Sequence, residues 1–97
     1  MNASDILFTN HFRALVMMYD YQVVVGNEKF SKITQVEISD KLGVSKVTVN
    51  HIMRDLMEKG FVVKEEKRIG KYYLSKEAEE IVEKLRQVDK LSNGYQS

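Results

Sequence analysis

The chain has 97 residues, 43% of them hydrophobic, which is enough for one small domain with a core but not for a large internal substrate pocket. It contains no cysteine, which excludes disulfide bonds and thiolate metal sites, and nothing at its N-terminus resembles a signal peptide, so we expect a cytoplasmic protein. No apolar run approaches the roughly 18 residues of a membrane-spanning helix, since Arg13, Asp20 and Gln22 interrupt the best candidate. The net charge is only +1, so any surface for nucleic acid must come from local charge.

A strongly apolar segment from about Asp5 to Val25 predicts a long first helix. Its apolar residues cover more than one stripe, so more than one neighbour must bury it, and one neighbour could be a second subunit. The β-branched run Val23-Val24-Val25 would also suit a strand, which leaves the end of this helix open. Residues 26–29 have the composition of a turn, and Ile33 could form a one- or two-residue bridge to a later hairpin.

The segment from Thr34 to Gly60 predicts two helices joined by a short turn. Thr34 and Glu37 have the spacing of a capping box, and Gly43 can adopt the left-handed conformation of a sharp helix end. Ser45 is then the N-cap of a second helix, which Gly60 ends. Helices joined so closely must cross steeply. We expect their crossing to be filled by Ile38, Leu42, Val44, Val49, Ile52 and Leu56.

The strand-like segments 61–63 and 71–74 predict a β-hairpin with a charged tip, in which one of the adjacent Tyr72 and Tyr73 faces inward and the other outward. Ser75 should cap a last helix that runs to about Leu91, followed by a frayed end at residues 92–97. We therefore expect a single domain, 1–97, with a helix-turn-helix at 34–60, a wing at 61–74 and a C-terminal helix at 75–91. The stripe of this last helix is Ala78, Ile81, Val82, Leu85, Val88 and Leu91.

Positive charge is concentrated in the helix-turn-helix and the hairpin. From Gly43 to Ser75 there are seven Lys and Arg residues against four acidic residues, which gives +3, whereas the parts before and after are each −1. This distribution is what an electrostatic footprint on phosphate requires. The alternative is that lysine and glutamate side chains only keep a hairpin soluble.

The run ITQVEISDKLGVSKVTVNHIMRDLMEKGFVVKEE, followed by YYLSKEAEEIVEKL, resembles the winged helix-turn-helix of the MarR-like bacterial and archaeal transcriptional regulators. The resemblance covers roughly residues 33–85 and implies a mainly α fold with a small β-hairpin wing that forms a DNA-binding domain. Ser39 stands where that family usually has a small alanine, and Gly60 matches the glycine that ends its recognition helix. The wing departs from the family, because residues 64–70 are shorter and lack its Asp-x-Arg motif.

Helical geometry indicates which side chains would read DNA. At about 100° per residue, a helix that buries Val49, Ile52 and Leu56 presents Val47, Asn50, His51 and Arg54 on its opposite face. The Asn50 amide can bond an adenine edge, Arg54 can reach guanine or phosphate, and Val47 can pack against a thymine methyl. Phosphate contacts are expected from Ser45, Lys46 and Thr48 at the helix start and from Lys67 and Arg68 at the hairpin tip. The alternative for all of them is an ordinary solvated helix face.

Other chemistries find little support in the sequence. His11 and His51 lie in different helices with no carboxylate or cysteine at ligand spacing, and there is neither a nucleophile elbow nor a glycine-rich phosphate loop. We therefore expect no enzyme, no metal site and no cofactor. The interpretation is a regulator that binds double-stranded DNA sequence-specifically, most simply a repressor, as a homodimer through its N- and C-terminal helices. The alternatives are a replication or partition DNA-binding protein of a plasmid or virus, and a winged-helix module that holds a protein partner.

Overall fold

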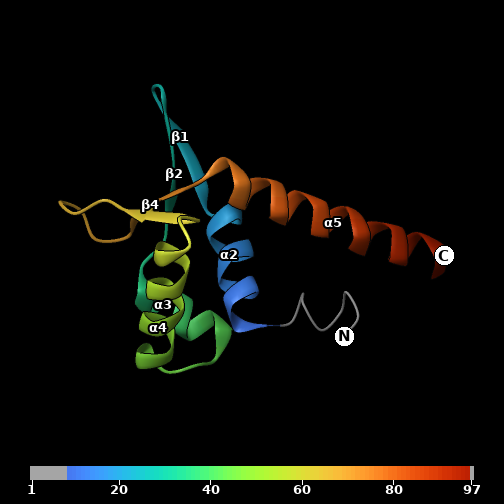
Figure 1. The fold of residues 1–97 in the computed structure, drawn as a ribbon, viewed down its shortest axis with the longest axis horizontal. Coiled ribbons are helices and arrows are strands. Elements are labelled where there is room, and N and C mark those ends of the chain that lie inside the picture. The colour runs from blue at the N-terminus through green and yellow to red at the C-terminus, as the bar shows by residue number, and fades with distance from the viewer. Residues whose placement is uncertain (1–8, 97) are drawn as a thin grey trace.

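The computed structural model describes residues 9–96, with side chains placed up to Gln87, as three short helices, a four-stranded sheet and a long last helix (Figure 1). The predicted start of the first helix near Asp5 lies outside these residues. None of the described helices is long and apolar enough to cross a membrane. The elements are α2 (Asn10–Asp20), β1 (Gln22–Val25), β2 (Glu28–Lys32), α3 (Gln35–Leu42), α4 (Lys46–Glu58), β3 (Val62–Lys64), β4 (Lys71–Leu74) and α5 (Lys76–Gln96).

The sheet is larger than the sequence predicted. Its strand order is β1-β2-β4-β3, with every neighbouring pair antiparallel. Residues 22–25, predicted as the end of the first helix, form a strand instead, because α2 ends at Asp20 and Gly26 turns the chain at a positive φ of 62°. The third strand, expected only around Ile33, spans Glu28–Lys32, and β1 is a fourth strand, which the β-branched run Val23-Val24-Val25 had left open as an alternative to helix. Together β1 and β2 form an arm that rises from the helices in Figure 1.

A buried serine joins this arm to the first helix. Ser31 is completely buried in β2, and its hydroxyl donates a 2.7 Å hydrogen bond to the backbone carbonyl of Met18. That bond satisfies a polar group which would otherwise be costly to bury. A further link runs from the arm to α5, where Glu79 forms an ion pair with Lys29 at 2.6 Å and accepts a hydrogen bond from Gln22 at 3.3 Å. The hydrogen bond from Lys29 lowers the pKa of the Glu79 carboxyl.

The predicted helix-turn-helix is confirmed in detail. Thr34 and Glu37 form the reciprocal capping box, and Gly43 ends α3 in the left-handed conformation. Ser45 caps α4 by accepting the amide hydrogen of Thr48. Ser39 does more than keep the helices close, because its hydroxyl donates a 2.6 Å hydrogen bond to the carbonyl of Val44 and so fixes the turn between them. Of the six residues expected at the crossing, only Val44 is half-buried; the others are buried.

The β3–β4 hairpin has the predicted alternation, with Tyr72 buried and Tyr73 half-exposed on the outer face of the sheet. Ser75 accepts the amide hydrogen of Ala78 as the predicted cap of α5. That helix continues to Gln96, beyond the predicted end near Leu91, and extends sideways from the other elements (Figure 1). Ala78 and Val82 are buried, whereas Ile81 and Leu85 are half-buried, so the apolar stripe becomes more exposed along the helix.

Replacing Gly70 by alanine should destabilise the base of the wing. Gly70 has a φ of 78°, and an added Cβ would meet the Thr34 methyl group at 3.0 Å. Its carbonyl also accepts the amide hydrogen of Ile33 at 3.1 Å, so the strain falls on the link between the hairpin and α3. We expect a loss of about 1 to 3 kcal/mol in urea unfolding. Gly26→Ala is the control for the backbone conformation, because it has a similar φ and nothing near its Cβ; an equal loss in both variants would contradict the steric explanation.

Candidate DNA-binding interface

The exposed face of α4 is the one that helical geometry predicted. Val49, Ile52, Met53 and Leu56 are buried against the other elements. On the opposite side, Val47 is 67% exposed, and the remaining predicted base-reading residues, Asn50, His51 and Arg54, are exposed as well. Ser45 and Lys46 are exposed at the helix start, where Thr48 is half-buried. The hydroxyl of Ser45 donates to that of Thr48 at 2.9 Å.

Asn50 and Arg54 form a pair on this face. The Arg54 guanidinium donates a 3.3 Å hydrogen bond to the side-chain oxygen of Asn50, one turn earlier in the helix. The amide oxygen has a second lone pair, so Asn50 still offers an acceptor and two N–H donors to a base edge, and the guanidinium retains further donors for a base edge or a phosphate. This pairing follows from i, i+4 geometry, but the sequence analysis did not identify it.

The wing lies beside α4. A hollow of about 290 Å³ is shared by Asn50 of α4, by the start of α3 and by residues of the wing. Its rim adds three exposed side chains that the sequence analysis did not select, Val36, Lys64 and Ile69, of which Ile69 is 91% exposed. Lys67 and Arg68 are exposed at the tip. Three segments that are separated in the chain thus border one concave surface, which no local sequence pattern could reveal.

His11 links α2 to α4. Its Nε2 atom lies 2.8 Å from the Asp55 carboxylate, and this hydrogen bond lowers the pKa of Asp55. His11 therefore has a carboxylate partner after all, although one carboxylate and one imidazole do not make a metal site. Among the described residues, no group of three or more potential metal-binding side chains occurs. His51, by contrast, belongs to the exposed face of α4.

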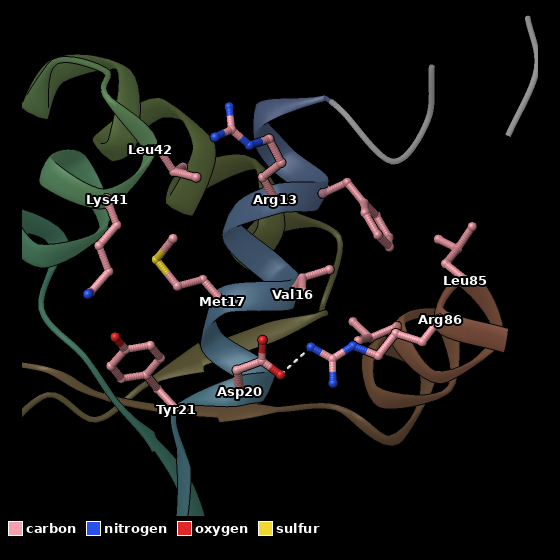
Figure 2. Close-up of a pocket in the computed structure, with 11 residues that line it drawn as sticks. Arg13, Val16, Met17, Asp20, Tyr21, Lys41, Leu42, Leu85 and Arg86 are labelled. Atoms are coloured by element: carbon pink, nitrogen blue, oxygen red, sulfur yellow. Dashed lines mark hydrogen bonds and ion pairs between the residues drawn. The ribbon is translucent and has the colours of Figure 1, made fainter. Parts of the chain in front are cut away.

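A second concave surface lies between α2, the end of α3 and α5 (Figure 2). This cleft, of about 550 Å³, is lined mainly by apolar side chains, among them Phe12, Val16, Met17 and Leu85. Arg13 and Lys41 lie at its edge, and Arg86 pairs with Asp20 across it. A cleft of this kind exposes apolar surface that a small domain would otherwise cover.

These features define a winged helix-turn-helix: a capped helix pair, an exposed second helix and a β-hairpin beside it. The family model described as the sugar-specific transcriptional regulator TrmB matches residues 21–79, which is more than half of the chain. The chain belongs to this family of transcriptional regulators. The resemblance to MarR-like proteins therefore holds at the level of the winged-helix regulator class, and a regulator family is not a family of enzymes.

One solved structure with the same fold is a transcriptional regulator of the CRP/FNR family from Thermus thermophilus. Its TM-score is 0.62 at 14% sequence identity, over 88% of this chain and 43% of that chain. The present chain thus spans less than half the length of that regulator, and at this identity the likeness concerns the fold alone. No curated protein sequence matches the chain.

Proposed function

We propose that this chain is a sequence-specific, double-stranded DNA-binding regulator that acts in the cytoplasm as a homodimeric repressor by occupying its operator. The observation that carries the proposal is the exposed α4 face, where Asn50 is hydrogen-bonded to Arg54 and lines a hollow together with residues of the basic wing. We assign base reading to Val47, Asn50, His51 and Arg54, and phosphate contacts to Ser45, Lys46, Thr48, Lys67 and Arg68.

Asn50→Ala should separate specificity from affinity. On an operator selected from a random duplex pool, it should cost roughly 1 to 3 kcal/mol, because alanine cannot form a bidentate bond to a base. On random duplex it should cost little, since every phosphate contact is retained. Arg68→Ala should instead weaken both duplexes by similar factors and reduce the slope of log affinity against log salt by about one for each phosphate that the protein no longer neutralises. The measurement is a pair of salt titrations for the wild type and both variants.

Lys84→Ala is the matched control for Arg68→Ala, because it removes the same charge from an exposed position of α5. It should leave the salt slope unchanged. Equal losses on the two duplexes for Asn50→Ala would mean that α4 does not read bases. If neither Asn50→Ala nor Arg68→Ala altered DNA binding at all, the protein-interaction alternative would replace this proposal.

For the homodimer we propose that the cleft between α2 and α5 receives a second copy. Its lining is mostly apolar, which suits a helix from another subunit better than a sugar, whose hydroxyl groups need hydrogen-bonding partners. Ile81 and Leu85 of α5 are only half-buried, so they have apolar surface left to contribute. Val88 and Leu91, the last two residues of the predicted apolar stripe, lie beyond the described side chains.

The alternative, a plasmid or viral replication or partition protein, predicts a different arrangement of binding sites on the DNA. A replication or partition protein of this fold would also bind duplex, so binding alone does not separate it from a repressor. A single palindromic operator upstream of a promoter, recovered by selection, would favour repression. Directly repeated sites would favour replication or partition.

A further inference from the structure

The strand β1 is a free edge of the sheet. In the order β1-β2-β4-β3, both β1 and β3 have a neighbour on one side only within the described chain. An open edge presents backbone N–H and C=O groups that can pair with another strand, and proteins usually protect such edges with charges, proline, bulges or short strands. We therefore compare β1 and β3 for the features that prevent an edge strand from pairing with another chain.

Both edge strands are short, but only β3 carries charge. The strand β3 has three residues, ends in Lys64 and is followed by two glutamates. The strand β1 has the sequence QVVV, without charge or proline, and pairs with β2 in continuous register from Gln22 to Val25, without a bulge. Two of its side chains project into solvent, since Val24 is 71% and Val25 60% exposed. An uncharged, regular edge strand of this kind is suited to pairing with a further strand.

We propose that β1 pairs edge to edge, antiparallel, with β1 of a second copy of this chain. Two identical strands in antiparallel pairing are related by a twofold axis, so the backbone N–H and C=O groups of each strand pair with the C=O and N–H groups of the other. The absence of charge in β1 means that no like charges meet in any register. The arm rises away from α3 and α4 in Figure 1, and Val24 and Val25 of β1 are exposed on it.

The size of this contact determines its role. Four paired residues bury far less than the roughly 1,600 Å² of a standard stable interface, so β1 cannot hold two free molecules together for long. It acts between copies that something else has already brought close, either two homodimers on neighbouring DNA sites or very concentrated protein. This role rests on the proposed DNA-binding function, and its consequence is cooperative occupation of adjacent sites.

A single engineered cysteine tests the contact directly, because the chain has no cysteine of its own. Val24→Cys, treated with a short bismaleimide, should give a covalent dimer both in concentrated protein and on long random duplex. The linker tolerates a shift of one or two residues in register, since each step along a strand moves the partner by only about 3.4 Å. Val63→Cys is the matched control, an exposed strand valine (59%) on the other edge. Crosslinking several-fold above this control is expected; equal or absent crosslinking at Val24 in both conditions would overturn the proposal.

Cooperativity supplies the second measurement. Val24→Glu introduces a carboxylate directly opposite Lys29, which the arm can accommodate, but two copies would then place like charges at the paired edge. It should leave affinity for a single operator unchanged and abolish the several-fold gain on a duplex with two adjacent operators, whereas Val63→Glu should retain that gain. A gain that survives Val24→Glu contradicts the proposal. A wild type that fails to bind any duplex refutes the DNA-binding function instead, and the crosslinking result in protein alone still decides whether β1 pairs.

Discussion

Replacing Leu56 by alanine should lower the free energy of unfolding by about 2 to 5 kcal/mol. Leu56 is 4% exposed on the inner face of α4, where it belongs to the cluster that also contains Ile38 and Ile52. Truncation removes buried branched atoms and leaves a cavity that neighbours held by two capped helices cannot easily fill. Because small domains are stable by only about 5 to 15 kcal/mol, this is the largest stability effect that we expect.

The measurement is urea unfolding at a fixed protein concentration, since dimerisation would make stability depend on concentration. Val47→Ala is the matched control, as Val47 lies on the same helix and is 67% exposed. It should be neutral or slightly stabilising, because alanine has the higher helix propensity. A loss below about 1 kcal/mol for Leu56→Ala would show that the helix crossing contributes less to stability than its burial implies.

Replacing Leu85 by glutamate should convert the proposed dimer into a folded monomer. Leu85 lines the cleft between α2 and α5 but does not belong to the buried core, so a carboxylate there should oppose association and leave the helix-turn-helix intact. A monomer engages one half-site instead of two, and operator affinity should fall on the order of 10²-fold or more. Sedimentation equilibrium at tens of micromolar and operator titration measure the two effects.

The control for the added charge is Gln87→Glu, an exposed position of the same helix that is two residues further along. It should change neither association nor operator affinity appreciably. A wild-type protein that sediments as a monomer at this concentration would contradict the helix-mediated dimer itself. A dimeric Leu85→Glu variant would place the interface elsewhere.

The helix-turn-helix was predictable from sequence because its signals are local. The capping box at Thr34, the glycine at 43 and the cap at Ser45 each act within one helical turn, so the printed sequence contains the cause of each boundary. The exposed face of α4 follows from the same periodicity. By contrast, the hollow between α4 and the wing arises from tertiary packing, and no pattern marks Val36 or Ile69 as part of it.

The arm was missed for a specific physical reason. A half-buried strand is usually recognised by alternating apolar residues, but the fully buried residue of β2 is Ser31, whose polarity is satisfied by the Met18 carbonyl. The segment EKFSK therefore has no strand signal, and without β2 as a partner the valines of β1 could equally be the end of the preceding apolar helix or a strand. Strand pairing is a property of two segments, and here only one had a recognisable pattern.

The pairing of β2 with β4 has a consequence for how the chain folds. Ser31 lies opposite Tyr72, so the whole helix-turn-helix and the start of the wing form one loop between two paired strands. Closing a loop of this length has an entropic cost that local helix formation does not have. We therefore expect the two capped helices to form early and the pairing of β2 with β4 to form late. The arm should then dock on the sheet only after the helix-turn-helix and the wing have folded.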